Sequence, residues 1–171
     1  MKRRTLYLVA GAPGAGKSVA TEALLGLESP FVFLDIDWLV APASALYGQD
    51  IRFSPESWSP YGELWFSVLH AVYQNGLTPV LFTPSDPSDY DEALPDWCGG
   101  LEWLLLDCAD DVRLERLHGR GWQGERLAEA FQDAALMRQL IPRRVDTGIL
   151  NPYEVAGQVL VWLKETPSQP F

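Results

Sequence analysis

The sequence has few of the residues that stabilise secreted domains or build thiolate metal sites. Cys98 and Cys108 are its only cysteines, no CxxC pair occurs, and no histidine lies near them at ligand spacing. These absences favour a reduced, cytoplasmic protein over one held by a disulfide or a zinc-thiolate site. No apolar run reaches the roughly 18 residues that a membrane-spanning helix needs. Residues 2–4 are basic, but a glycine-rich stretch soon interrupts the apolar run after them, so we interpret that run as a first strand and not as an export signal.

Positive charge is also scarce in the middle of the chain. Of the 13 Lys and Arg residues, only Arg52 lies between Lys17 and Arg113, whereas that interval is rich in Asp and Glu. The arginines then concentrate between Arg113 and Arg144. The net charge of -10 argues against nucleic acid or an anionic membrane surface as a partner. With 171 residues, 47% of them hydrophobic and 21% charged, the chain suits one globular domain covering 1–171.

A glycine-rich stretch near the N-terminus matches the pattern G-x-x-x-x-G-K-[ST] at every fixed position. It reads Gly11, Ala12, Pro13, Gly14, Ala15, Gly16, Lys17 and Ser18, with Val19 next. An apolar run at 5–10 precedes it and a helical stretch at 18–26 follows, which is the context of a phosphate-binding loop. Glycine amides and the helix N-terminus would surround the terminal phosphates of ATP. Lys17 would reach the same oxygens, and the Ser18 hydroxyl would bind Mg²⁺. We therefore predict an ATP and Mg²⁺ site at residues 11–19.

The next apolar run, residues 31–37, is predicted to be a strand that ends in Asp35 and Asp37. Ligand groups in parallel sheets lie at the carboxyl ends of strands, so both carboxylates should lie near the phosphate loop. Two residues apart on a strand, they would point the same way. One would hold the water shell of Mg²⁺ and the other would accept the proton of an incoming hydroxyl. The sequence leaves the two roles open, and we take Asp35 as the metal residue and Asp37 as the base. The alternative is that Asp37 only caps the following helix.

The rest of the chain alternates between helical and strand-like periods. The predicted helices are a short one near Ala43 and 62–74, 112–118, 125–140 and 153–163, and the predicted strands are 77–83, 101–108 and 143–148, with a loop at 53–60 and a frayed tail at about 166–171. Strands that alternate with helices predict a parallel sheet covered on both faces. We therefore expect a three-layer α/β/α fold with a five-stranded parallel sheet.

Aromatic residues gather between the second and third predicted strands. They are Trp38, Phe53, Trp58, Tyr61, Trp65 and Phe66. They would form either an apolar wall for a hydroxylated organic molecule or core packing beneath the covering helices, and the sequence leaves both interpretations open. His70 lies among apolar positions of helix 62–74 and is interpreted as a structural residue.

Four segments resemble the P-loop kinases of the nucleoside-monophosphate-kinase-like group, which contains shikimate kinase, gluconate kinase and chloramphenicol phosphotransferase. In chain order they are GAPGAGKS, LDID, DDVRLERLHGR and VDTGILNPYEV, and they span nearly the whole chain. The resemblance implies that Arg116 packs on adenine and that Arg120, in a lid at about 117–140, closes over the phosphates. It also implies that the loop after Asp146, with Thr147, lines the adenine edge. Such a lid suits phosphoryl transfer, which needs charge neutralisation and water exclusion.

The chain departs from these enzymes in two places. The third predicted strand ends in Thr-Pro-Ser at 83–85, with no acid for the metal, which leaves that role to Asp35 and Asp37. No arginine other than Arg52 is available in the middle of the chain to hold an anionic acceptor. An acidic cleft favours a neutral or cationic acceptor instead. Three further arginines are interpreted as solvated charges on helix faces: Arg113, Arg126 and Arg138.

These observations predict an ATP-dependent phosphotransferase that moves the γ-phosphoryl group to a hydroxyl of an antibiotic, a nucleoside or a metabolite. Lys17, Asp37 and Arg120 are its predicted catalytic residues. The alternative is a nucleotide-binding switch or NTPase that signals to a partner protein, with the arginine-bearing segment as the surface that changes. The compact length favours the kinase.

Overall fold

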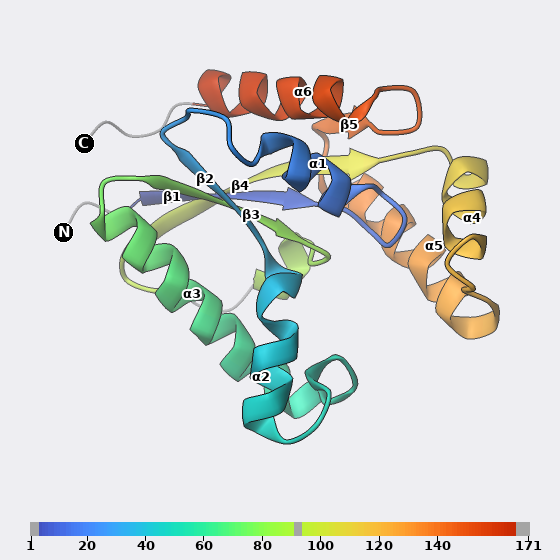
Figure 1. The fold of residues 1–171 in the computed structure, drawn as a ribbon, viewed down its shortest axis with the longest axis horizontal. Coiled ribbons are helices and arrows are strands. Elements are labelled where there is room, and N and C mark those ends of the chain that lie inside the picture. Colours follow the sequence, from blue (N-terminus) through green and yellow to red (C-terminus); the bar gives the residue numbers. More distant parts are fainter. Residues whose placement is uncertain (1–3, 91–93, 167–171) are drawn as a thin grey trace.

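The structure, a computed structural model, describes residues 4–90 and 94–166 (Figure 1). Its centre is a five-stranded sheet in the order β2-β3-β1-β4-β5, and every neighbouring pair runs parallel. The strands are β1 (Arg4–Ala10), β2 (Phe31–Asp35), β3 (Thr78–Thr83), β4 (Cys98–Asp107) and β5 (Arg144–Asp146). The predicted five-stranded parallel sheet is therefore confirmed in the described part of the chain.

Helices cover both faces of the sheet, as predicted. They are α1 (Lys17–Leu24), α2 (Val40–Tyr47), α3 (Trp58–Gln74), α4 (Asp110–His118), α5 (Gly124–Leu140) and α6 (Pro152–Glu165), with short 3-10 helices η1 (Ile36–Leu39), η2 (Ile51–Phe53), η3 (Pro55–Ser57) and η4 (Pro87–Tyr90). Figure 1 shows α1 and α6 over one face and α3 over the other, and α5 packs on this second face through its own small apolar cluster. The arrangement is the expected three-layer α/β/α fold.

The alternation of side chains along β1 divides the core into two layers. Tyr7 and Val9 belong to the cluster that contains the apolar side of α6, where Tyr7 meets Trp162 edge to face at 5.6 Å between ring centroids. Leu6 and Leu8 belong to the opposite cluster, with the buried residues of α3. Because β1 is buried on both faces, its sequence is a continuous apolar run and shows no polar alternation.

Two boundaries differ from the predictions in ways that affect the site. The second strand ends at Asp35 and not at 37, because the Asp35 carboxylate accepts the N–H of Asp37 at 3.0 Å and so starts η1. Helix α3 begins at Trp58, inside the predicted loop 53–60, since Pro60 falls in the first turn, where its missing N–H costs no helical bond. The predicted tail lies, beyond Thr166, outside the described residues.

The carboxyl ends of the strands meet at one edge of the sheet. There β1 leads into the phosphate loop, residues 11–18, while β2 leads into η1 and α2, and β4 leads into α4. The elements that carry the predicted site residues therefore converge at this edge, where ligands bind in open parallel sheets. None of the described helices combines the length and the apolar character needed to cross a membrane.

Candidate phosphate-binding and acceptor site

The phosphate loop has a backbone that only glycine accommodates at its key positions. Gly14 and Gly16 have φ angles of 82° and 87°, in the left-handed region that disfavours side chains. At Gly11 a Cβ atom would lie 3.0 Å from the Leu106 carbonyl oxygen. The glycines of the motif are therefore required by turn geometry and by close packing against β4.

Three consecutive carbonyl groups of the loop accept hydrogen bonds from side chains outside it. The bonds run from Arg113 Nη1 to Pro13 O at 2.6 Å, from Arg116 Nη1 to Gly14 O at 3.0 Å and from Thr147 Oγ1 to Ala15 O at 2.8 Å. In a trans peptide unit the C=O and the following N–H point in opposite directions. The amides of Gly14 and Gly16 are therefore turned away from these donors, an orientation in which they would be free to bind an anion.

Lys17 is the first residue of α1 and directs its ammonium group back to the loop. Its Nζ donates a hydrogen bond to the carbonyl oxygen of Gly11. Burial lowers the Lys17 pKa from 10.5 to about 8, although the nearby carboxylates of Asp37 and Asp35 act in the opposite direction. The structure thus places one cation and two carboxylates close enough for their charges to influence one another.

Asp35 is buried at the end of β2 and is only 2% exposed. Burial raises the pKa of Asp35, while the N–H of Asp37, which bonds to its carboxylate, and the nearby Ser18 hydroxyl act in the opposite direction. The two predicted metal residues, Ser18 and Asp35, therefore lie close together. A hydroxyl beside a carboxylate supplies the oxygen ligands that Mg²⁺ prefers.

Asp37 lies on η1, exposed to solvent, and does not lie on the strand with Asp35. The prediction that both carboxylates project from one strand is wrong, because the chain turns into a 3-10 helix directly after Asp35. The alternative prediction, that Asp37 caps the following helix, is also wrong. Asp35 is the residue that caps η1, and its carboxylate accepts the N–H of Asp37. The Tyr61 hydroxyl fixes the turn by donating a hydrogen bond to Ile36 O.

Arg116 and Thr147, predicted to lie near the nucleotide base, contact each other and the loop. Arg116 Nη2 donates to Thr147 O at 2.7 Å, and its Nη1 lies 3.7 Å from where a Cβ atom of Gly16 would be. Arg120 is exposed in the turn after α4, close enough for its charge to lower the Lys17 pKa. Val19 is 48% exposed on the first turn of α1.

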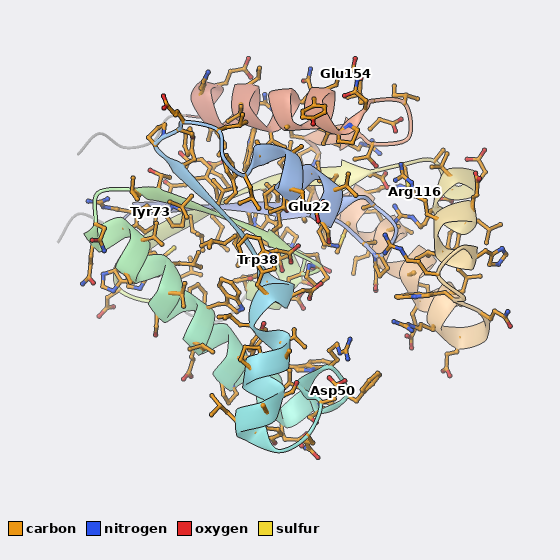
Figure 2. The ribbon with its side chains drawn as sticks, viewed as in Figure 1. Glu22, Trp38, Asp50, Tyr73, Arg116 and Glu154 are labelled. Carbon is orange, nitrogen blue, oxygen red and sulfur yellow. The ribbon has the colours of Figure 1, made fainter. Side chains whose placement is uncertain are left out.

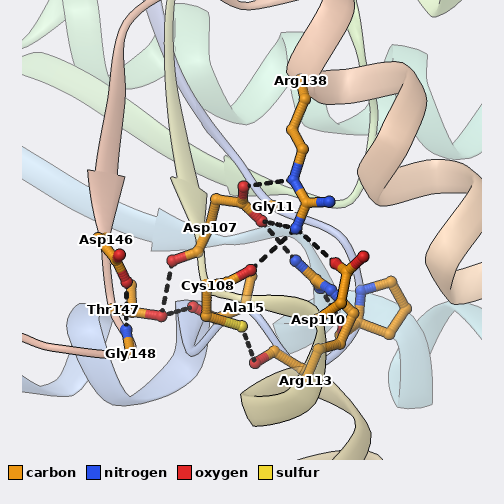
Figure 3. Close-up of polar contacts among 12 residues, drawn as sticks. Gly11, Ala15, Asp107, Cys108, Asp110, Arg113, Arg138, Asp146, Thr147 and Gly148 are labelled. Atoms are coloured by element: carbon orange, nitrogen blue, oxygen red, sulfur yellow. Dashed lines mark hydrogen bonds and ion pairs between the residues drawn. The ribbon is translucent and has the colours of Figure 1, made fainter.

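Asp107, at the end of β4, is the polar residue near the loop that the sequence interpretation missed (Figure 3). Arg113 Nη2 bonds to one of its carboxylate oxygens at 2.6 Å, and Arg138 Nε bonds to the other at 2.6 Å. Although burial alone would raise the pKa of Asp107, the hydrogen bonds and charges of the two arginines hold it below its ordinary value. Arg138 Nη2 also reaches the carboxylate of Asp110 at 2.7 Å.

The interpretation of Arg113 and Arg138 as solvated charges is therefore wrong. Arg113 is 0% exposed, and Leu117, one helical turn later, is also buried, so both lie on the inner face of α4. That spacing was visible in the sequence, as was the acid that ends the apolar run of β4. Arg126 is exposed on α5 and stacks on the Trp122 ring, with 3.6 Å from its Cζ to the ring centroid.

The aromatic group after β2 divides between the two interpretations that the sequence left open. Trp65 is 3% exposed and belongs to the core under α3, and Tyr61 and Phe66 pack against the same cluster. Trp38, Phe53 and Trp58 are 47%, 80% and 57% exposed. Core packing thus explains three of the six residues. The three exposed ones lie on η1, on η2 and at the start of α3. His70 stacks on Trp97 at 5.1 Å between centroids, in agreement with a structural role.

A cavity of about 660 Å³ opens beside Asp37 and extends along α2 to Arg52. Figure 2 shows Trp38 on η1 and Asp50 in the turn after α2, whereas Arg116 comes from α4. The exposed carboxylate of Asp37 therefore lies at a cavity that is large enough to hold a small molecule.

Comparison with solved structures shows the fold of P-loop kinases. A sugar kinase from Janibacter sp. HTCC2649 matches with a TM-score of 0.64 and 19% identity, covering 96% of both chains. The tunicamycin resistance protein of Deinococcus radiodurans matches with a TM-score of 0.65 and 14% identity over 99% of this chain and 100% of that one. Shikimate kinase from Aquifex aeolicus matches with a TM-score of 0.56 and 19% identity, covering 94% of this chain and 96% of that one. The sequence matches no protein-family model and no curated protein sequence.

Proposed function

We propose that this protein is an ATP-dependent kinase that transfers the γ-phosphoryl group to a hydroxyl group of a neutral or cationic small molecule. The observation that carries the proposal is the phosphate loop itself, with three outward-held carbonyls and with Lys17 close to both carboxylates. Phosphoryl transfer depends mainly on positioning and on charge stabilisation, and this arrangement supplies both.

The residues around the loop fit ATP and Mg²⁺. The amides of Gly14 and Gly16, which point away from the donors that bond to the loop carbonyls, would bind the phosphates. Ser18 and Asp35, which lie close together, would hold Mg²⁺ directly or through its water shell. The metal would neutralise charge on the phosphate oxygens. Thr147 and Arg116 would lie at the nucleotide base, on the outer side of the loop.

Asp37 is the residue that would accept the proton of the acceptor hydroxyl. Its side chain is exposed at the cavity, whereas Asp35 is buried and already accepts the N–H of Asp37. The geometry therefore favours separate roles, with Asp35 serving the metal and Asp37 serving the acceptor. Lys17 and Arg120 would stabilise the charge of the transferred group from two sides.

The acceptor class follows from the charges near Asp37. Asp37, Asp50 and Arg52 are the charged residues that line the cavity, so Asp37 remains as its one unpaired charge among the described lining residues, and the net charge of the chain is -10. A phosphorylated acceptor would be repelled by this field, whereas a neutral or cationic molecule would not.

The test is an ADP-release assay with ATP, with and without Mg²⁺, against hydroxylated compounds that include sugars, nucleosides and antibiotics. Once an acceptor is found, Asp37→Asn should lower kcat by about 100-fold or more, the usual contribution of a general base, with ATP affinity changed only a few-fold. Glu22→Gln, which neutralises an exposed acid on α1, is the matched control and should retain activity. Phosphoryl transfer that persists in Asp37→Asn would remove this residue from the mechanism.

A further inference from the structure

The cavity beside Asp37 has an organised charge pattern that goes beyond the general acidity of the region. Its floor is formed by small residues of α2, Ala41 and Ala45 among them, and Asp37 precedes the first turn of this helix. Asp50 and Arg52 line the cavity after the last turn. Arg52 is the single cation among the lining residues, all of which the structure describes.

We propose that Asp50 determines acceptor specificity by neutralising Arg52, so that the cavity takes a neutral, polyhydroxylated molecule and excludes carboxylate and phosphate acceptors. This inference rests on the proposed kinase function and narrows its acceptor class. Arginine is the side chain best suited to bind a carboxylate or phosphate through two parallel hydrogen bonds. In this protein, a carboxylate of the chain itself occupies that position.

The pair is held by more than one contact. Arg52 Nη2 bonds to Asp50 Oδ2 at 2.6 Å and Arg52 Nε bonds to Asp50 Oδ1 at 2.9 Å, a two-pronged arrangement. The same Oδ1 accepts the backbone N–H of Arg52 at 3.0 Å and caps η2. The Arg52 guanidinium also lies 5.9 Å from the centroid of the Phe53 ring. Asp50 thus occupies the Nε–Nη2 edge of a guanidinium whose side chain is 64% exposed, and an acceptor anion would have to compete with it for that edge.

The same contacts argue for hydroxyl groups and against an amine at this end of the cavity. Asp50 and Arg52 form an exposed ion pair whose charges sum to zero, so this end of the cavity carries no net negative charge to attract a cation. The carboxylate oxygens can still accept hydrogen bonds from hydroxyls, since each has more than one lone pair. The methyl groups of Ala41 and Ala45 offer an apolar surface to the C–H face of a ring.

The experiment compares gluconate with glucitol, two probes that share a polyol chain and differ by a carboxylate. Each is titrated into the full-length protein while the Nε–H resonance of Arg52 is followed by NMR, with Arg52→Gln to identify the signal. We expect Asp50→Asn to bind gluconate about tenfold more tightly than the wild type does, because a charge-assisted bond to the freed guanidinium becomes available. Affinity for glucitol should change by less than about twofold.

Glu56→Gln is the matched control for charge alone. Glu56 accepts hydrogen bonds from Tyr47 and Gln49 and does not bond to Arg52, so this variant should bind both probes as the wild type does. An equal gain in Glu56→Gln, or no gain in Asp50→Asn, would overturn the inference. Because binding is measured without ATP, it is independent of turnover. If the NMR result holds but no hydroxylated compound supports ADP release, the proposed function fails, and only the exclusion of anions from the cavity by the Asp50–Arg52 pair stands.

Discussion

Replacing Arg113 by methionine is expected to destabilise the protein and to loosen the phosphate loop. Methionine keeps much of the volume of the side chain but removes the bonds to Asp107 and to Pro13 O, both at 2.6 Å. Because Arg113 is 0% exposed and Asp107 only 8%, water cannot readily replace the lost partner.

The magnitude follows from two opposing effects. Removing one member of a buried ion pair costs about 3–5 kcal/mol. Among the described residues Arg113 Nε is buried without a hydrogen-bond partner, and its removal should return about 1 kcal/mol. Arg138 stays bonded to Asp107, so the carboxylate keeps one counter-ion. We therefore expect a loss of about 2–4 kcal/mol in unfolding free energy, roughly 5–15 °C in Tm for a chain of this length.

The assay is thermal unfolding by circular dichroism, combined with calorimetric titration of ATP well below the transition. Arg143→Met is the control, because its ion pair with Glu165 is exposed and should contribute less than about 1 kcal/mol. In the folded Arg113→Met variant, ATP affinity should fall by about tenfold, since the Pro13 carbonyl loses its donor. Equal Tm values for the Arg113 and Arg143 variants would refute the reasoning.

Two further predictions concern the loop. Because the Lys17 pKa is lowered from 10.5 to about 8, the charged form is disfavoured in the folded protein, and the free energy of unfolding should rise as the pH increases from 8 to 10.5. Bound triphosphate should raise the Lys17 pKa again. Calorimetry of ATP binding near pH 8.5, in buffers of different ionisation enthalpy, should therefore detect proton uptake that Lys17→Met abolishes. In urea unfolding, Gly14→Ala should lower the free energy of unfolding more than Gly76→Ala does. Both glycines have positive φ, which costs a side-chain-bearing residue about 1–2 kcal/mol. Only at Gly14 would the new Cβ also meet a side chain, 3.2 Å from Arg113 Cγ.

The parts of the site that local sequence determines could be predicted. The phosphate loop depends on glycines at fixed spacing between a strand and a helix, and the motif states both conditions. The capping of α6 by Asn151, whose side chain accepts the N–H groups of Tyr153 and Glu154, is equally local. Each of these features depends on residues within one short segment.

The parts that failed depend on competition or on distant partners. For residues 31–37, strand and turn compete, and the Asp35 side chain decides in favour of the turn by capping η1. The role of Arg113 depends on Asp107, six residues earlier at the end of β4, and on the carbonyl group of Pro13, which comes close only when α4 packs beside the loop. Helix periodicity places Arg113 on the same face as Leu117, which indicates burial, whereas its charge favours exposure; the structure shows that Arg113 is buried.

The uneven distribution of charge along the sequence has a physical explanation in the fold. The donors that bond to the loop carbonyls, Arg113, Arg116 and Thr147, all lie after residue 112. The carboxylates near Lys17 come from the last residue of β2 and from η1 directly after it. The arginine-rich and the acidic segments of the sequence therefore meet at the loop. A triphosphate placed there would be neutralised from the arginine side, while the acceptor hydroxyl would lie on the carboxylate side. Under the proposed function, this segregation of charge would let ATP and the acceptor approach the loop from different sides.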